Sequence, residues 1–252
     1  MVSLDWLTTR PIAHRGFHNP DDGPVENTLS AVDAAIARDL AIEVDLQVSA
    51  DGGAMVIHDG SLDRMTDETG SIIARSADEL KQIEITGSGG DHIVELEQLL
   101  DHVDGRVPLV LEIKSTWSAD MRIVDRINQL LANYTGAAAV MSFDPEIVAR
   151  FARITPDLPR GIISDGAHDL NHWGRATTME RFGLRHLLHA PRTRPHFVAY
   201  DIRALPAVAP VLAKWLLGKP LLTWTVKTTE QIALGQRWAD QLIFEGFDPA
   251  KL

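Results

Sequence analysis

The most informative absence in this 252-residue chain is that of cysteine. Without a thiol the chain can form neither a disulfide framework nor a thiolate zinc site, and a cysteine nucleophile is excluded as well. The chain also lacks an apolar run of the roughly 20 residues that a transmembrane helix requires. Residues 1–6 lack the basic start and apolar core of a secretory signal. We therefore expect a cytoplasmic protein without stable membrane insertion.

Positive charge is also scarce, because 24 Lys and Arg face 35 Asp and Glu, which gives a net charge of −11. Nonspecific nucleic-acid binding requires clustered Lys and Arg, so we expect no nucleic-acid partner. Hydrophobic residues make up 45% of the chain, which is enough to bury a core. No internal repeat or low-complexity linker is visible, so we expect a single domain over residues 1–252. A homo-oligomer is compatible with the sequence, but no feature indicates one.

Short apolar runs alternate with helical patterns along the chain. We expect strands at 11–15, 42–48, 107–114, 137–143, 160–164, 197–201, 221–226 and 241–245. We expect helices at about 26–39, 94–103, 119–132, 145–154, 172–189, 205–217 and 229–239. Eight strands alternating with helices predict an α/β protein with a (β/α)8 TIM barrel. A doubly wound open sheet competes, but it usually has fewer strands and often a glycine-rich phosphate loop, which does not follow the first strand here.

The stretch 60–92 interrupts this alternation with polar residues and turn signals. Asp51-Gly52-Gly53 is a turn signal, after which residues 55–58 return as the second arm of a hairpin. The sequence therefore predicts a small insertion after the second strand.

Ionisable side chains gather at the carboxyl ends of the early strands and of the hairpin arm, where a barrel of parallel strands places its active site. They are His14, Arg15, Glu43, Asp45, His58, Glu112 and Lys114. Each alone is more simply explained as a salt bridge or a strand-end charge. Burying this many ionisable side chains without a metal or substrate would cost several kcal/mol for each unpaired charge. Together they therefore indicate a functional site.

The three acidic residues Glu43, Asp45 and Glu112 suit a divalent cation. They offer hard oxygen donors and no sulfur, a set that fits Mg²⁺ or Ca²⁺ better than zinc. The alternative is that Glu43 or Glu112 simply pairs with Arg15 or Lys114.

The basic members of the group suit an anionic substrate. His14 and His58 can divide acid and base work, and Arg15 and Lys114 can bind phosphate oxygens. With a metal beside them, these residues favour phosphoryl transfer or phosphodiester cleavage.

The motifs around these residues resemble those of the glycerophosphodiester phosphodiesterases. They are Ile-Ala-His-Arg-Gly at 12–16, Glu-Asn-Thr at 26–28, Glu-Val-Asp-Leu-Gln-Val at 43–48, His-Asp at 58–59, Glu-Ile-Lys at 112–114 and Trp-Thr-Val at 224–226. The resemblance implies a barrel of the phospholipase C-like phosphodiesterase type. It implies hydrolysis of small glycerophosphodiesters to glycerol 3-phosphate and an alcohol through a cyclic phosphate.

The resemblance also implies roles for single residues. One divalent cation would be held by Glu43, Asp45 and Glu112, while His14 would act as general base and His58 as general acid.

Three further residues receive weaker interpretations. Glu26 and Asn27 are expected to have a mixed role. They would orient His14 or a metal-bound water, and they would also start a helix, with Asn27 as its cap and Glu26 near the positive end of its dipole. Trp224 either lines the site for the glycerol carbons or packs as an ordinary strand-end aromatic. The family usually has an aspartate where Glu245 stands and an asparagine where Lys227 stands, so the head-group end of the site is the least defined.

Alternative functions come from other classes. A lysophospholipase D or phospholipase C acting on lipids would need an exposed apolar or basic rim, of which 60–92 shows little. A noncatalytic sugar-phosphate-binding barrel would not need both His14 and His58. An amidohydrolase-type barrel typically opens with His-x-His, which this chain lacks.

Two other patterns are interpreted as structural. The pairs His168/His172 and His186/His189 have helical spacing but are expected to be surface or packing residues. The basic run Arg185, Arg192, Arg194 and His196 is expected to be a solvated face or an oligomer contact.

Overall fold

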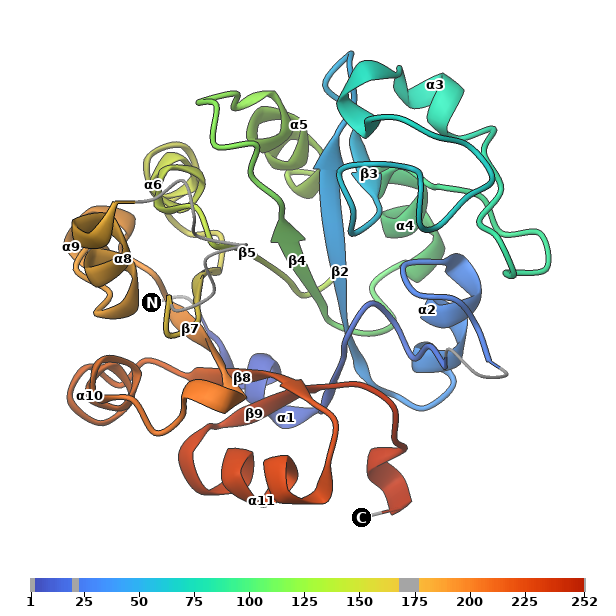
Figure 1. The fold of residues 1–252 in the computed structure, drawn as a ribbon. Coiled ribbons are helices and arrows are strands. Elements are labelled where there is room, and N and C mark those ends of the chain that lie inside the picture. The colour runs from blue at the N-terminus through green and yellow to red at the C-terminus, as the bar shows by residue number, and fades with distance from the viewer. Residues whose placement is uncertain (1–2, 20–22, 168–176, 252) are drawn as a thin grey trace. The chain divides into compact units, whose positions relative to one another are not determined.

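The computed structural model describes residues 3–19, 23–167 and 177–251. The chain divides into two compact units, one of residues 12–140 and one of residues 1–11 together with 141–252. Figure 1 colours the chain by residue number, so that the elements of each unit can be followed. In the described part of the chain, no helix combines the length and the apolar character needed to cross a bilayer. That residues 1–252 form a single domain stays a prediction.

The unit 12–140 is built around β2 (Ala41–Val48), which has β1 (Ile12–Ala13) and β4 (Leu109–Ile113) as parallel neighbours. All but one of the β2 residues are buried, as expected for a parallel strand covered on both faces. β3 (Ala54–Val56) follows a turn and runs antiparallel to the end of β2, which confirms the predicted hairpin.

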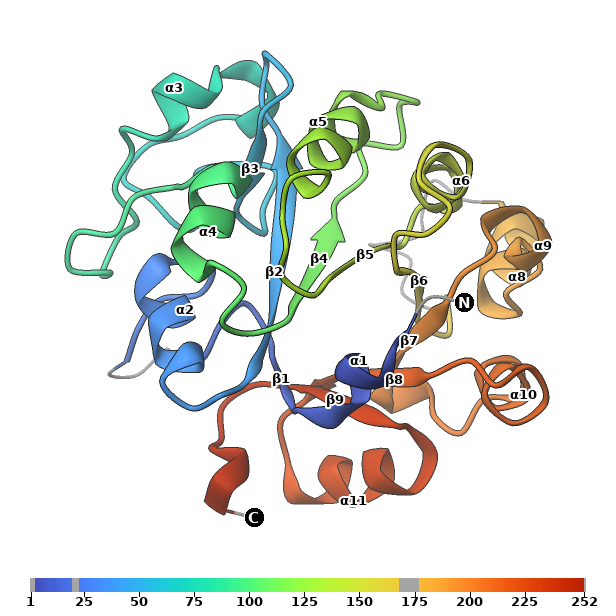
Figure 2. The ribbon, with the colours of Figure 1, turned by 180° about the vertical axis from the view of Figure 1, so that it is seen from behind.

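Helices α2 (Leu29–Ile36) and α5 (Arg122–Leu131) pack against β2, and α4 (Leu96–Val103) contacts both helices (Figure 2). The N-cap of α2 is Thr28, whose side chain accepts a hydrogen bond from the N–H of Ala31. The expectation that Asn27 caps this helix is therefore wrong. Asn27 adopts a left-handed backbone, with φ +58°, and its amide is engaged elsewhere.

The inserted segment 60–92 has little regular structure but an apolar cluster of its own. It contains η1 (Ile72–Ala74) and α3 (Ala77–Leu80), with a capping box between Ser76 and Glu79. The cluster joins the insertion to β3 and its flanks, and its buried members are Met55, Ile57, Leu62, Met65, Ile72, Ala77, Leu80, Ile83, Ile85 and Ile93. These scattered apolar residues hold the segment in place beside the strand ends.

The second unit contains four parallel strands in chain order: β6 (Arg160–Ser164), β7 (Phe197–Asp201), β8 (Leu221–Val226) and β9 (Gln241–Phe244). β5 (Ala138–Ser142) lies where the chain passes from one unit to the other. Among its described residues, the helices are α1 (Asp5–Thr9), α6 (Pro145–Ile154), α8 (Thr178–Arg185), α9 (Ala190–Thr193), α10 (Val208–Leu217) and α11 (Thr229–Trp238), with short turns η2 (Ile202–Ala204) and η3 (Pro249–Lys251). α10 packs against β7 and β8, and α11 against β8 and β9.

The expected order of elements is confirmed in the described residues, apart from the short helices α1 and α3, which were not expected, and the helix expected at 172–189. α1 was not expected, because five residues are too few for a periodic pattern. The single helix expected at 172–189 is wrong in its described part, since α8 ends at Arg185 and α9 begins at Ala190. Leu187 has φ +56°, a left-handed backbone that a continuous α-helix cannot contain.

Two adjacent isoleucines test the apolar cluster of the insertion. Ile72 is 1% exposed and Ile73 is 37% exposed. We expect Ile72→Ala to lower the free energy of unfolding by about 2–5 kcal/mol, because it leaves a cavity, and Ile73→Ala by under about 1 kcal/mol. Urea unfolding measures both, and equal losses would show that the cluster does not stabilise the fold.

Candidate active site

The seven ionisable residues singled out from the sequence all lie in the unit 12–140, either within β2 or at the carboxyl ends of β1, β3 and β4. His14 and Arg15 follow β1, Glu43 and Asp45 lie in β2, His58 comes two residues after β3, Glu112 lies in β4 and Lys114 follows it. The parallel register places Asp45 beside Glu112 on the neighbouring strand. Strand pairing thus brings residues that are far apart in the sequence to one edge of the sheet.

The three carboxylates predicted to bind a cation are close together and buried. Glu43, Asp45 and Glu112 each offer one oxygen, and these oxygens lie within 4.8 Å of one another. Glu43 is 1% exposed, Asp45 0% and Glu112 7%. Glu43 accepts a hydrogen bond from the backbone N–H of Arg15 at 3.0 Å through Oε2. Its Oε1 is buried and has no hydrogen-bond partner among the described residues.

Two cations neutralise part of this acidic cluster. The Nζ of Lys114 lies 2.8 Å from Oδ1 of Asp45 and also contacts Glu112. The Nε of Arg15 lies 3.1 Å from Oδ2 of Asp45. Burial lowers the pKa of Lys114 and that of Arg15, but the neighbouring carboxylates raise both by more. Both side chains are therefore cations in the folded protein.

The charges of the three acids are unequally compensated. Burial raises the pKa of Asp45, but Lys114 and Arg15 lower it by more, so the net pKa lies well below the ordinary value. Burial and the charges of Asp45 and Glu112 raise the pKa of Glu43 well above its ordinary value. Two cations thus face three acids, and Glu43 carries the unbalanced repulsion. The donor set fits a divalent cation, which would supply the missing positive charge.

Asn27 fixes the position of Asp45 from the neighbouring loop. Its Nδ2 donates to Oδ2 of Asp45 at 2.9 Å, and its Oδ1 accepts from the Asp45 backbone N–H at 3.2 Å. Both ends of one amide therefore bind one residue. The sequence predicted that Asn27 would orient His14 or a metal-bound water; in the structure its amide binds Asp45, one of the three predicted cation ligands.

His58 is held by its immediate neighbours. Its Nδ1 lies 2.6 Å from Oδ1 of Asp59, and its carbonyl accepts a hydrogen bond from the Gln47 side chain at 2.7 Å. With Nδ1 engaged, Nε2 is the nitrogen that can exchange a proton with a ligand. Burial lowers the pKa of His58, and the charges of Lys114 and Arg15 lower it further, while Asp45 and Asp59 oppose them.

Arg64, from the inserted segment, connects His58 to the first loop. Its Nε lies 2.6 Å from Oδ2 of Asp59, and its Nη2 donates to Oε1 of Glu26 at 2.7 Å. Glu26 in turn accepts from Nη1 of Arg15 at 2.8 Å. Burial raises the pKa of Asp59, but the hydrogen bonds from Arg64 and His58 lower it to about 2. A charged chain of hydrogen bonds thus runs from His58 to Arg15.

Sequence reasoning assigned no role to Asp59 or Arg64. The adjacency of Asp59 to His58 was a usable signal, because a carboxylate next to a histidine can fix its tautomer. Arg64 gave no such signal, since only the fold of the insertion brings it to Glu26.

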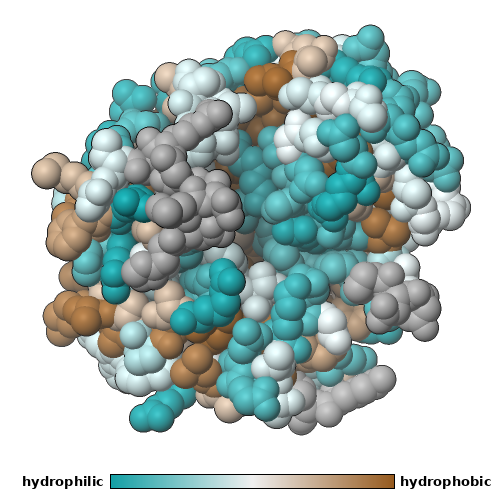
Figure 3. All heavy atoms as spheres, viewed as in Figure 1, coloured by the Kyte–Doolittle hydropathy of each residue, from teal (hydrophilic) through white to brown (hydrophobic). Residues whose placement is uncertain are grey.

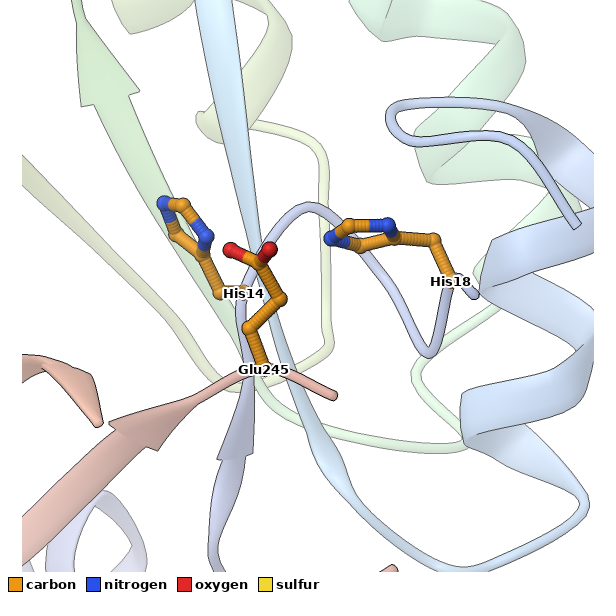
Figure 4. Close-up of side chains that lie close together, drawn as sticks. All are labelled: His14, His18 and Glu245. Carbon is orange, nitrogen blue, oxygen red and sulfur yellow. The ribbon is translucent and has the colours of Figure 1, made fainter. Parts of the chain in front are cut away.

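The other predicted base, His14, lies beside the acidic cluster. Its Nε2 is 3.9 Å from Oε2 of Glu43. His18 is four residues further on, and its ring lies beside that of His14, with ring nitrogens of the two within 4.8 Å of each other (Figure 4). His14 and His58 both lie near enough to Asp45 for their charges to lower its pKa. His18, which is buried, was not predicted.

The remaining predicted residues belong to the unit containing 141–252. Trp224 packs edge-on against Phe143, with ring centroids 5.4 Å apart, and its role in lining the site stays a prediction. Lys227 and Glu245, the two departures from the family pattern, form an ion pair at 2.8 Å.

The histidine pairs provide no further site in the described residues. The Nδ1 of His189 lies 3.3 Å from the hydroxyl of Thr193, and burial lowers the pKa of His189 to about 4. His186 packs against the ring of Phe182. This agrees with the packing role expected for this pair. The pair His168/His172 lies outside the described residues.

Comparisons with known proteins agree on one family. The sequence profile of the glycerophosphoryl diester phosphodiesterase family matches residues 14–248. The Bacillus subtilis (strain 168) protein YhdW is 31% identical over 162 residues, which are 61% of this chain and 65% of that protein. A glycerophosphodiester phosphodiesterase of Bacillus altitudinis is 27% identical over 166 residues, 62% of this chain and 66% of that protein. The chain thus spans just under two thirds of the length of these relatives.

Solved structures of similar fold cover almost the whole chain. A phosphodiesterase from Oleispira antarctica, in complex with the product sn-glycerol-3-phosphate, has a TM-score of 0.76 and 20% identity over 94% of each chain. A likeness of this kind shows the fold. The chain has the (β/α)8 barrel fold with one additional strand, β3, and the predicted fold class is confirmed.

Replacing Glu43 tests the cation site. At saturation of about one hundred times the dissociation constant, Mg²⁺ or Ca²⁺ should stabilise the wild-type chain by about 2.7 kcal/mol. We expect Glu43→Gln to remove most of this gain. Without cation, Glu43→Gln should unfold at the same or a higher temperature than wild type, because the amide relieves repulsion among the three acids.

Thermal unfolding with added cation and with chelator measures both effects. Glu97→Gln, which changes an exposed carboxylate on α4, is the matched control and should keep the full gain. If Glu43→Gln is stabilised by the cation as strongly as wild type, Glu43 is not a ligand.

Proposed function

The chain belongs to the glycerophosphoryl diester phosphodiesterase family, and from this premise we propose that it hydrolyses glycerophosphodiesters to glycerol 3-phosphate and an alcohol. The observation that carries the proposal is the buried cluster of Glu43, Asp45 and Glu112 with His14 and His58 near it. The Oleispira antarctica phosphodiesterase, which has a similar fold and is bound to sn-glycerol-3-phosphate, supports the same product.

Glu43, Asp45 and Glu112 would hold one Mg²⁺ or Ca²⁺. When bound, the cation would act as a Lewis acid on a phosphate oxygen. Arg15 and Lys114 lie at the same edge of the sheet and would bind the other charged phosphate oxygen. Their guanidinium and ammonium groups are already fixed by Asp45, so little side-chain entropy remains to be lost on binding.

The two histidines would move the protons of the first step. His14 would take the proton of the glycerol 2-hydroxyl as that oxygen forms a bond to phosphorus. His58 would deliver its proton from Nε2 to the leaving alcohol as the bond from phosphorus to the alcohol oxygen breaks. The result is a cyclic glycerol phosphate and a free alcohol.

The second step reverses the roles of the two histidines. His58 would take a proton from water as the water oxygen bonds to phosphorus, and His14 would return its proton to the 2-oxygen as the ring opens. Glycerol 3-phosphate leaves, and both histidines regain their starting protonation states.

The test is the release of glycerol 3-phosphate from glycerophosphocholine, glycerophosphoethanolamine and glycerophosphoinositol. We expect release by wild type, and its loss when a chelator removes divalent cations. His14→Ala and His58→Ala should each lower kcat by about 10²–10⁴-fold, because each would remove one proton-transfer group. His92→Ala, in the exposed part of the insertion, is the matched control and should leave kcat unchanged.

Two outcomes would contradict the proposal. Near-normal turnover by either active-site variant would remove that histidine from the mechanism. Release of choline from lysophosphatidylcholine, without turnover of any water-soluble diester, would indicate a lipid phosphodiesterase instead.

Arg64 tests the hydrogen-bond chain behind His58. We expect Arg64→Gln to lower kcat by about 10–100-fold with little change in KM, because Asp59 loses the partner that fixes it against His58. The same loss leaves Asp59 free to stabilise protonated His58, so the limb of the pH–rate profile that reports His58 should move to higher pH.

The control for Arg64 is Arg75→Gln, which removes another arginine of the insertion, one paired with Glu68. It should change neither kcat nor the pH profile. An unchanged pH profile in Arg64→Gln would assign Arg64 a purely structural role.

A further inference from the structure

Exposed apolar side chains are concentrated in one segment of the chain, residues 177–219. Ten large hydrophobic side chains are exposed in the described part of the protein, and eight of them lie in this segment: Met179, Phe182, Leu188, Val208, Leu212, Trp215, Leu216 and Leu217. They lie on α8, α10 and the turn before α9, which are neighbours in both ribbon views, and Figure 3 shows hydrophobic surface over these elements. Such a concentration indicates an interaction surface.

The outer face of α10 carries most of this surface. Val208, Leu212, Trp215 and Leu216 are spaced by four, three and one residues, which places them on one side of the helix. Their exposed fractions are 72%, 46%, 69% and 74%. The opposite side of α10 packs against β7 and β8. A surface helix normally has polar residues on its outer face, and α10 reverses this pattern.

The same segment has the opposite charge from the rest of the protein. Residues 177–219 contain seven Lys and Arg against two Asp and Glu, a net charge of +5, in a chain whose net charge is −11. The remaining residues therefore carry −16. Arg192, Lys214 and Arg203 pair with Glu146, Asp240 and Asp201. The other four basic residues of the segment are Arg181, Arg185, Arg194 and Lys219. They form no salt bridge with another described residue.

The charge decides between two occupants of this surface. A second copy of the chain, related by a two-fold axis, would bring one basic surface against another, which is unfavourable. An anionic lipid bilayer offers apolar chains for the stripe and negative head groups for the basic residues. Trp215 has the amphipathic indole typical of the membrane–water boundary, and Nζ of Lys214 lies 5.6 Å from its ring centroid.

We propose that the surface formed by α8, α9 and α10 binds peripherally to anionic lipid bilayers. α10 lies in the plane of the interface, with its apolar stripe among the acyl chains and the arginines of α8 at the phosphates. This binding needs neither the acidic cluster nor turnover, so it does not rest on the proposed hydrolase activity.

Cosedimentation of the full chain with vesicles tests the proposal. We expect binding to vesicles of phosphatidylcholine and phosphatidylglycerol at 3:1, and at least about tenfold weaker binding to phosphatidylcholine alone. Raising the salt concentration to about 0.5 M should weaken the binding, because surface charge is then screened.

Two double variants separate the apolar and charged parts of the surface. Trp215→Ser with Leu216→Ser should lower vesicle affinity at least about tenfold, because both exposed side chains lose their place among the acyl chains. Arg181→Gln with Arg185→Gln should lower affinity for the anionic vesicles and reduce the salt dependence. The matched controls are Ile73→Ser and Arg153→Gln, which change exposed residues outside the segment and should bind as wild type.

A folding control is measured for each variant. This control is the turnover of a water-soluble glycerophosphodiester, or thermal unfolding if wild type shows no turnover. Folded double variants that bind vesicles as tightly as wild type would overturn the proposal. Absence of wild-type binding to anionic vesicles would also overturn it. If the chain instead forms a dimer that Trp215→Ser with Leu216→Ser dissociates, the surface is a contact between copies.

Discussion

The carboxylate of Asp45 is the constraint on which the rest of the site depends. It is fully buried in β2, where an unpaired charge would cost several times the energy of an ordinary hydrogen bond. Lys114, Arg15 and Asn27 each bind it, and they come from three different segments of the chain. Compensating one buried charge therefore fixes the loop after β1, the start of α2 and the end of β4.

The same interaction explains why the cluster suits catalysis as well as folding. Asp45 takes up the positive charge of both neighbouring cations, which leaves Glu43 repelled by Asp45 and Glu112. Repulsion among the three carboxylates increases the affinity of the site for a divalent cation. Binding of the cation removes this repulsion and also forms new metal–oxygen bonds. Local stability and cation affinity are thus opposed within one group of residues. Stabilising changes at Glu43 should weaken binding for this physical reason.

Much of this arrangement could be predicted from the sequence, and the failures have identifiable causes. The alternation of apolar strands and helices predicted the barrel, and the spacing of two predicted that Glu43 and Asp45 share one face of their strand. That Glu112 joins them was expected from the placement of strand ends in a barrel and from the family resemblance. Asn27 was partly misjudged, because Asn and Thr are both good helix caps and the sequence places them side by side. The actual cap, Thr28, leaves Asn27 free to adopt a left-handed backbone and turn its amide to Asp45.

Arg64 could not be found in the same way, since no local pattern connects it to His58. It reaches Asp59 and Glu26 because an apolar cluster folds the insertion against β3. The polar composition of 60–92 correctly indicated an interruption of the barrel, but it concealed this cluster, whose members are too scattered to give a helical or strand period. A segment without periodicity can still be held in place when its few apolar residues join one buried cluster with a neighbouring strand.

The net charge of the whole chain does not reveal the charge of a single surface region. The net charge of −11 argues against nucleic acid as a partner, yet it is the sum of a basic segment at 177–219 and a strongly acidic remainder. At physiological ionic strength, exposed charges more than about 8 Å apart are largely screened from one another, so a partner at the surface experiences the local charge. An acidic chain can therefore present a cationic, apolar face to a membrane.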